Sequence, residues 1–213
     1  MRLDDRQLAA AWQSQSLLLA YPDEALLGHV HVVRRALPRL PARVADPLAR
    51  FLDHVDATPL LELAADYVAT LDNTKRCALF LTYYAHGDTR NRGVALLRLK
   101  QTYQRAGLQL VDDELPDHLA VVLEFAAAID SDAALRLLCG HRAGLELLRL
   151  ALRDERSPWA YVLDSVSATL PELRGDELSA IARLAAEGPP EEQVGLAPFA
   201  PPEYMPEPAG DRR

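Results

Sequence analysis

Residues 119–129 read Leu-Ala-Val-Val-Leu-Glu-Phe-Ala-Ala-Ala-Ile, and this stretch decides the fold class. Glu124 is its only charged residue, and neither glycine nor proline interrupts it. Leucine and alanine favour helix over sheet, and a helix without a polar face is normally buried on all sides. We therefore expect this helix to lie at the centre of a helical bundle. Glu124 then needs a partner or a water-lined groove, because an unpaired buried carboxylate is unfavourable.

Helical periodicity continues on both sides of this stretch, and cap residues mark several helix starts. Asp4 or Asp5 can cap the first helix, and Asp23 can cap the second. Thr58, followed by Pro59 at the first helical position, marks the start of a later helix. No segment shows a convincing strand pattern. The sequence therefore predicts an all-α fold, a single bundle of about nine to ten helices, over residues 5–19, 24–33, 42–55, 59–71, 75–86, 89–107, 116–129, 132–153, 157–170 and 176–187.

The composition changes after residue 188. Seven of the 25 residues from 189 to 213 are proline, and the apolar periodicity stops there. Such a segment cannot bury enough apolar surface to fold. We expect one all-helical domain over residues 1–188, followed by a disordered proline-rich tail over residues 189–213.

The charge balance limits the class of partner. Of 213 residues, 23 are Lys or Arg and 31 are Asp or Glu, which gives a formal net charge of −8. Nucleic acids and anionic membranes need clustered Lys and Arg, so neither partner is expected. The first residues lack the apolar region of a secretory signal, and no apolar run is long enough to span a bilayer. We expect a cytoplasmic protein without stable membrane association.

Motifs of catalysis and cofactor binding are missing from the sequence. It has no phosphate-binding glycine loop, no nucleophile elbow and no zinc-protease motif. His29 and His31 are two positions apart, so on a helix they point to different faces, whereas metal ligands usually sit three or four apart. No histidine follows an acid by three positions, so the di-iron bundle pattern is missing too. We expect no catalytic residue, no metal site and no cofactor.

A polar cluster, Glu114-Leu115-Pro116-Asp117-His118, precedes the apolar helix. With Pro116 at the first helical position, Asp117 and His118 fall in the first turn, where free N–H groups and the helix dipole favour an acid. One interpretation is a well-capped helix start. Another is a patch at the mouth of a groove that presents Glu114 and Asp117 to a cationic partner. Acid–base catalysis is a third, which no nucleophile or cofactor motif accompanies.

Two other segments have both a structural and a functional interpretation. Gly87 to Gly93 could bind an anion at a helix N-terminus, or it could be an ordinary helix joint whose arginines pair with acids. Tyr67 and Leu71 are four positions apart on one helical face, so they could line an apolar groove or pack in the core. The candidate residues of the first segment are Asp88, Thr89, Arg90 and Arg92.

The order and spacing of five segments resemble a known family, the NarJ group of nitrate reductase delta-subunit-type assembly chaperones. This group belongs to the TorD/DmsD family of redox-enzyme maturation proteins. The resemblance runs from about residue 17 to residue 152. Thr70 and Leu71 depart from the family's Tyr-x-x-Leu-Phe motif, and Pro116 is displaced by one position from its Glu-Pro-x-Asp-His motif. The segments are 67–72 (YVATLD), 79–84 (LFLTYY), 87–93 (GDTRNRG), 114–119 (ELPDHL) and 123–125 (LEF).

The resemblance implies a TorD/DmsD-like helical fold and a function without catalysis. Such proteins bind the apo catalytic subunit of a membrane molybdoenzyme, for NarJ the nitrate reductase alpha subunit, through its N-terminal segment. They hold it in the cytoplasm until the molybdenum cofactor and an iron–sulfur cluster are inserted, and membrane docking follows. Molybdenum cofactor biosynthesis proteins are further candidate partners. Partner binding is assigned to Tyr67, Leu71, Glu114, Pro116, Asp117, His118 and Glu124.

Other functions stay open from the sequence. Residues 87–93 would be the anion site of a direct carrier of the molybdenum cofactor or of a guanine nucleotide. The client could be another molybdoenzyme of the same superfamily, or the chain could be a permanent structural subunit of the mature enzyme. An acidic, helical chain with few motifs fits a helix-in-groove binder, whose ligand has one apolar face and some Arg or Lys.

Overall fold

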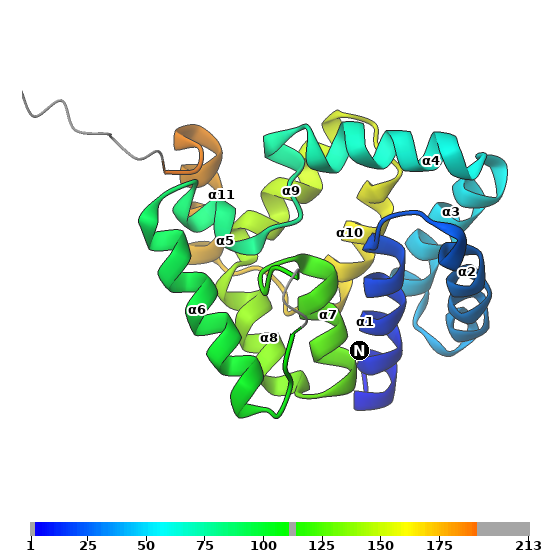
Figure 1. Cartoon of the computed structure of the whole chain (residues 1–213), viewed down its shortest axis with the longest axis horizontal. Coiled ribbons are helices and arrows are strands. Elements are labelled where there is room, and N and C mark those ends of the chain that lie inside the picture. Colours follow the sequence, from blue (N-terminus) through cyan, green and yellow to red (C-terminus); the bar gives the residue numbers. More distant parts are fainter. Residues whose placement is uncertain (1–2, 111–113, 191–213) are drawn as a thin grey trace, which may run out of the picture.

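The computed structural model describes residues 3–110 and 114–190, and within these ranges the chain forms eleven α-helices and no strand (Figure 1). The all-α prediction is confirmed, whereas nearly all of the predicted tail lies outside the described residues. The helices are α1 (Asp5–Leu19), α2 (Glu24–Ala36), α3 (Ala42–Ala57), α4 (Leu60–Tyr67), α5 (Leu81–His86), α6 (Arg90–Arg105), α7 (Leu119–Ala128), α8 (Ser131–Gly140), α9 (Arg142–Asp154), α10 (Trp159–Thr169) and α11 (Gly175–Glu187), with short helical turns η1 (Leu37–Arg39), η2 (Val68–Asp72) and η3 (Lys75–Cys77).

Aspartate caps begin the first two helices, as the sequence predicts. Asp4 accepts a hydrogen bond from the Gln7 backbone N at 2.8 Å, and the Gln7 side chain bonds back to the Asp4 backbone N. This reciprocal pair is a capping box, which satisfies two free donors at once. Asp23 accepts from the Ala25 backbone N at 2.8 Å. Local chemistry therefore fixes where α1 and α2 start.

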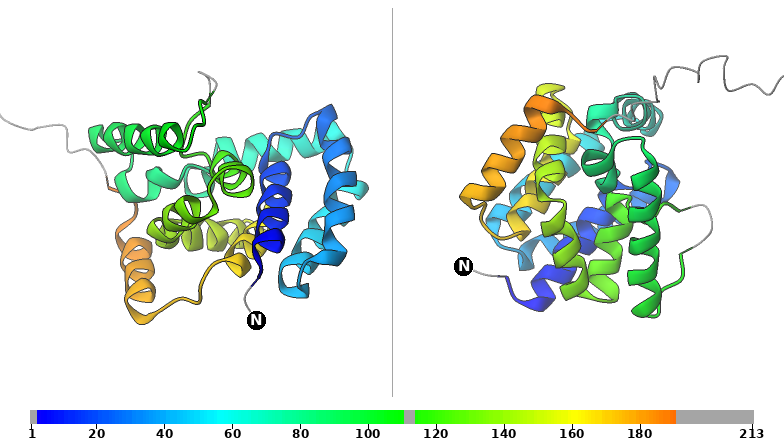
Figure 2. Two further views of the ribbon diagram at one scale, coloured as in Figure 1. Left: turned by 90° about the horizontal axis from the view of Figure 1, so that it is seen from below. Right: turned by 90° about the vertical axis from the view of Figure 1, so that its left-hand side faces the viewer.

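Helix α1 lies at the centre of the bundle and packs against α2, α7 and α10 (Figures 1 and 2). Helix α10 packs in turn against α3 and α9, while α8 lies against α7 and α11 covers α9. Two buried hydrogen bonds fix α1 on α10: Trp12 Nε1 donates to Thr169 Oγ1 at 3.0 Å, and Gln15 Nε2 donates to Ser165 Oγ at 2.9 Å. The bundle core is thus built around α1.

Helix α7, predicted at the centre, is enclosed on only part of its surface. Helices α1 and α8 cover two sides, and Leu119, Val122 and Leu123 are fully buried there. Glu124 and Ala128 are exposed, so one side remains open to solvent. Although α7 is the most apolar helix, it has 10 residues, and none of the helices in the described ranges has the length and apolar character needed to cross a bilayer.

The predicted helix over 75–86 is wrong in its first half, because residues 78–80 are extended and α5 begins only at Leu81. The Leu81 backbone N donates to the Asp117 carbonyl at 2.9 Å, beside an isolated antiparallel bridge. The same pairing delays the start of α7 to three residues later than predicted. A pairing between segments so far apart leaves no trace in local periodicity.

The predicted helix over 132–153 is two helices, α8 and α9, divided at His141. The His141 backbone (φ −107°, ψ 17°) leaves the helical region, and its Nδ1 lies 2.9 Å from the Leu137 carbonyl. Next to this break, α9 approaches α5 closely at Gly144, where a Cβ would lie 2.7 Å from the Cβ of Tyr84. Tertiary packing, rather than helix propensity, sets the direction of α9.

Candidate functional site

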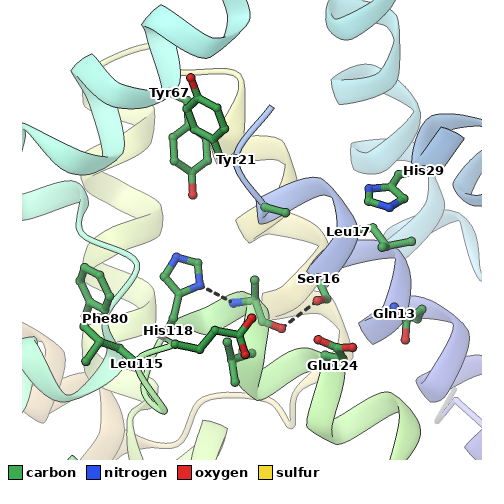
Figure 3. Close-up of a pocket in the computed structure, with 14 residues that line it drawn as sticks. Gln13, Ser16, Leu17, Tyr21, His29, Tyr67, Phe80, Leu115, His118 and Glu124 are labelled. Carbon is green, nitrogen blue, oxygen red and sulfur yellow. Dashed lines mark hydrogen bonds between the residues drawn. The ribbon is translucent and has the colours of Figure 1, made fainter. Parts of the chain in front are cut away.

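A pocket with a volume of about 520 Å³ lies over α1 and α7 (Figure 3). The end of α4 closes one side, α2 contributes His29, and the extended segment before α5 faces the segment before α7. Its 14 lining residues are Gln13, Ser16, Leu17, Ala20, Tyr21, His29, Tyr67, Phe80, Glu114, Leu115, His118, Ala120, Val121 and Glu124.

The floor of the pocket explains why α7 has almost no polar face. Val121 of α7 and Leu17 of α1 are both half-buried, and both line the pocket. The Ser16 hydroxyl donates to the Ala120 carbonyl at 2.8 Å and holds the two helices together beneath it. The apolar side of α7 that no helix covers therefore forms a floor that is open to a ligand.

The ionisable groups around this floor are carboxylates, imidazoles and tyrosines. Glu114 and Glu124 are exposed, and His29 and His118 are the imidazoles. None of the 14 lining residues, all within the described part of the chain, is Lys or Arg. Carboxylates beside an apolar floor complement a ligand that carries apolar side chains and positive charge. The structure brings the predicted Glu114, His118 and Glu124 together, and their role in binding stays a prediction.

Tyr67 belongs to both the core and the pocket wall. Its hydroxyl donates to the Leu19 carbonyl at 3.0 Å, and its ring packs edge-on against Tyr21 at 5.6 Å and Trp159 at 5.5 Å between centroids. Burial raises the pKa of Tyr67, so the hydroxyl stays a donor. Leu71, its predicted groove partner, is buried in the core and is not among the lining residues.

Asp117 is fully buried, at 0% exposure, and does not line the pocket. Its Oδ2 accepts from the Thr82 backbone N at 3.2 Å and from the Thr82 hydroxyl, in the first turn of α5. The predicted place in the first turn of the following helix is therefore wrong, because Asp117 precedes α7 and caps α5. Pro116 is also buried, and its carbonyl accepts from the Tyr103 hydroxyl at 2.7 Å. Both residues support the pocket without facing a ligand in this conformation.

Arg92 connects this buried carboxylate with the pocket wall. Its guanidinium lies 3.7 Å from Asp117 Oδ2 and 3.4 Å from Asp88 Oδ1. The same group stacks over the Phe80 ring at 5.4 Å from the centroid, and Phe80 packs edge-on against His118 at 5.4 Å. Two carboxylates already balance the Arg92 charge, so the geometry supports the helix-joint interpretation of residues 87–93 and not an anion site.

The other residues of the segment 87–93, which joins α5 to α6, also make contacts within the fold. The Thr89 hydroxyl donates to the His86 carbonyl at 2.7 Å, and Arg90 is exposed at the start of α6. Gly87 has a φ of +57°, and a Cβ there would overlap the Pro190 carbonyl. Both the backbone conformation and this close approach require glycine. The joint therefore packs against the last residues that the structure describes.

His118 is the N-cap of α7. Its Nδ1 accepts from the Ala120 backbone N at 3.3 Å, one of the dashed lines in Figure 3. This bond needs an unprotonated Nδ1, so we assign the proton of the neutral ring to Nε2. Burial lowers the pKa of His118, and the nearby Asp117 and Asp72 charges oppose this effect. The imidazole is therefore neutral near pH 7 and has one N–H to donate.

Sequence reasoning missed the part of the pocket that α1 and the extended segment provide. Gln13 and Leu17 of α1, Tyr21 after it and Phe80 all line the pocket. The sequence offered one local indication of these pocket residues, which is Tyr21, an aromatic residue between the end of α1 and Pro22. Among the described residues, no three His, Cys, Asp or Glu side chains are grouped so that they could hold a metal ion.

Comparison with known sequences gives one family. The family model described as "Nitrate reductase delta subunit" matches residues 37–164, more than half of the chain. The candidate nitrate reductase molybdenum cofactor assembly chaperone NarJ of Bacillus subtilis is 31% identical over 171 residues, which cover 80% of this chain and 92% of that protein. NarJ of Escherichia coli is 34% identical over 70% of this chain and 64% of its own length.

A longer relative and a solved structure are also similar to this chain. The nitrate reductase-like protein NarX of Mycobacterium tuberculosis is 39% identical over 74% of this chain, which spans only 24% of NarX. The crystal structure of a candidate redox enzyme maturation protein from Archaeoglobus fulgidus matches with a TM-score of 0.53 over 83% of this chain and 93% of that one. At 19% identity, this likeness concerns the fold alone.

Proposed function

The chain belongs to the nitrate reductase delta subunit family, and from this we propose that it is a cytoplasmic chaperone for the apo alpha subunit of a respiratory nitrate reductase. The family includes nitrate reductase molybdenum cofactor assembly chaperones, which are not named as catalysts. In this proposal the chain binds the N-terminal segment of the alpha subunit. It keeps the subunit competent for insertion of molybdenum cofactor and an iron–sulfur cluster before membrane docking.

The pocket over α1 and α7 is the observation that supports this proposal. A floor made by Val121 and Leu17, with Glu114 and Glu124 exposed around it, suits an amphipathic segment that carries Arg or Lys. Burying one Leu or Val side chain contributes about 1.5–3 kcal/mol to the gross affinity, before the loss of motion on binding is subtracted. The carboxylates then provide orientation and a faster encounter.

The direct test is titration of a synthetic peptide that covers the N-terminal segment of the alpha subunit. We expect saturable binding by calorimetry, and a change in tryptophan fluorescence, because Trp159 packs on the pocket residue Tyr67. Glu124→Lys should weaken the affinity about tenfold, since it replaces attraction of a cationic peptide by repulsion. Val121→Ser should weaken it as well, because it removes part of the apolar floor.

Glu187→Lys is the matched control, because it makes the same charge change at an exposed position of α11 outside the pocket. This variant should bind the peptide as tightly as the parent chain. Equal loss of affinity in Glu124→Lys and Glu187→Lys would reject the pocket as the binding site. No binding to the parent chain would reject recognition of the N-terminal segment.

The client can be identified by affinity purification of the tagged chain from cells that respire nitrate without oxygen. We expect the alpha subunit without molybdenum cofactor, with molybdenum cofactor biosynthesis proteins as further partners. Recovery of only active, metallated enzyme would instead indicate a permanent subunit. Recovery of a different molybdoenzyme would keep the chaperone class and change the client.

A further inference from the structure

Helix α6 has a charge composition opposite to that of the chain. The formal net charge of the protein is −8, yet residues 90–105 contain no Asp or Glu. Ion pairing inside the fold accounts for part of this positive charge, because Arg92 points inward and pairs with the buried Asp117. The five basic residues of α6 are Arg90, Arg92, Arg98, Lys100 and Arg105.

The outward face of α6 is also apolar at its middle. Leu99 and Tyr103 point into the bundle and are buried. On the opposite side, Val94 is 52% exposed and Leu97 is 57% exposed. Helical periodicity places these two side chains within one turn of each other, at the centre of the face directed away from the bundle.

Exposed cations lie on both sides of this aliphatic pair. At 100° per residue, Arg98 and Arg105 fall on one flank of Leu97 and Val94, and Lys100 falls on the other. Helix α6 lies along an edge of the molecule in Figures 1 and 2, and the face carries no carboxylate of its own. We call Val94, Leu97, Arg98, Lys100 and Arg105 the α6 face.

The net charge of the chain argues against an anionic membrane as partner, but the basic residues are concentrated on α6. From this uneven distribution we propose that the α6 face docks weakly on the anionic headgroups of a lipid bilayer. The α6 face shares two features with helices that lie in a membrane interface, namely Lys and Arg side chains and accessible aliphatic side chains next to them. The cations bind the anionic headgroups, and Val94 and Leu97 enter the boundary between headgroups and acyl chains. The negative charge elsewhere on the chain allows approach only with the α6 face toward the bilayer.

The size of the α6 face favours a lipid surface over an acidic protein. A helix of 16 residues is about 24 Å long. A specific protein interface needs roughly 800 Å² and 20–30 residues on each partner. Two aliphatic side chains and three cations fall far below that, but they suffice for reversible, salt-sensitive attachment to an anionic surface.

The test is flotation of the full chain with vesicles of phosphatidylcholine, with or without phosphatidylglycerol. We expect binding only to the vesicles with phosphatidylglycerol, and release at about 500 mM salt, where the screening length falls to a few ångströms. The double variant Arg98→Glu/Arg105→Glu should lower the partition coefficient at least about tenfold. Leu97→Ser should lower it about threefold, because less apolar surface enters the bilayer.

The matched control is Arg35→Glu/Arg183→Glu, which makes the same charge change at exposed helix positions outside the α6 face. It should keep vesicle binding within about twofold of the parent chain. Flotation is measured without peptide, so the result does not depend on the proposed chaperone function. Equal flotation of both double variants, equal binding to neutral vesicles, or capture of an acidic protein in place of lipid would overturn the proposal.

Discussion

Two carboxylates contact the same arginine but differ in their surroundings. Asp117 is fully buried beside Arg92, and its side chain also accepts two hydrogen bonds from Thr82. The Asp88 side chain is 63% exposed and meets the same guanidinium from the solvent side. A buried charge pair is much more sensitive to loss of one partner than an exposed pair is. At this scale, burial decides which acid matters for stability.

We therefore expect Asp117→Ala to lower the free energy of unfolding by about 2–3 kcal/mol, because the first turn of α5 loses its acceptor and Arg92 keeps only its exposed partner Asp88. Asp88→Ala should lower it by less than about 1 kcal/mol. Denaturant unfolding of both variants measures the difference. Unchanged stability together with lost peptide affinity in Asp117→Ala would restore the sequence-based view of a ligand-binding acid.

His118 should make stability depend on pH. Burial lowers its pKa in the folded chain, so the unfolded chain, with a pKa near 6.5, binds the proton more readily. Stability is then complete above about pH 6.5 and decreases as the pH falls from there toward the folded pKa. Protonation of Nδ1 also removes the cap on α7.

The comparison is His118→Asn, which can cap a helix and does not titrate. Between about pH 7 and pH 5.5, the melting temperature of the parent chain should fall further than that of the variant. If the melting temperatures of the parent chain and the variant fell equally over this range, the pKa of His118 would be the same in the folded and the unfolded chain.

A single glycine can allow two helices to approach each other closely. Gly144 lets α9 pack on α5, and a Cβ there would lie 2.7 Å from Tyr84 Cβ. Gly93 lies inside α6 and has no heavy atom within 4 Å of the corresponding position. Gly144→Ala should therefore destabilise the protein by about 1–3 kcal/mol, whereas Gly93→Ala should stabilise it by roughly 0.5–1 kcal/mol through helix propensity. Thermal unfolding gives the sign of each change, and stabilisation by both would contradict the packing of α9 on α5.

The helices that local chemistry specifies could be predicted from the sequence. Asp4 and Asp23 cap α1 and α2, and the predicted residues 60–71 are helical through α4 and the η2 turn. The predicted start is off by one residue, because Pro59, with a ψ of 140°, is the N-cap of α4 and not its first helical residue, and the Thr58 side chain does not cap it. The break at His141 and the extended residues 78–80 could not be predicted, because packing against distant segments produces both. Periodicity describes what a segment favours alone, and tertiary contacts changed that preference in these two places.

The candidate site could be predicted only in part, for the same reason. Glu114, His118 and Glu124 belong to one stretch of chain, and they do meet at the pocket. The residues contributed by α1 and by Phe80 could not be placed, because a single sequence does not show which helix lies opposite α7. Asp117 was misplaced, since its partners on α5 and α6 are distant in sequence.

Over the whole molecule, the acidic pocket and the basic α6 face have no residue in common. The net charge of −8 attracts a cationic peptide from a distance, and Glu114 and Glu124 direct it to the pocket. The α6 face carries its positive charge on other residues, so the peptide is not repelled at its binding site. Electrostatic attraction of this kind acts mainly on the association rate.

The association rate constant of the cationic peptide should therefore fall about tenfold between about 20 mM and about 500 mM salt, while the dissociation rate changes little. Glu114→Gln/Glu124→Gln should associate more slowly at low salt and respond less to added salt, because two of the attracting charges are gone. The control Glu172→Gln/Glu187→Gln makes the same change in net charge at exposed positions outside the pocket. Stopped-flow fluorescence measures both rates. Equal salt dependence in the two double variants would mean that net charge alone attracts the peptide, and that the pocket carboxylates have no directing role.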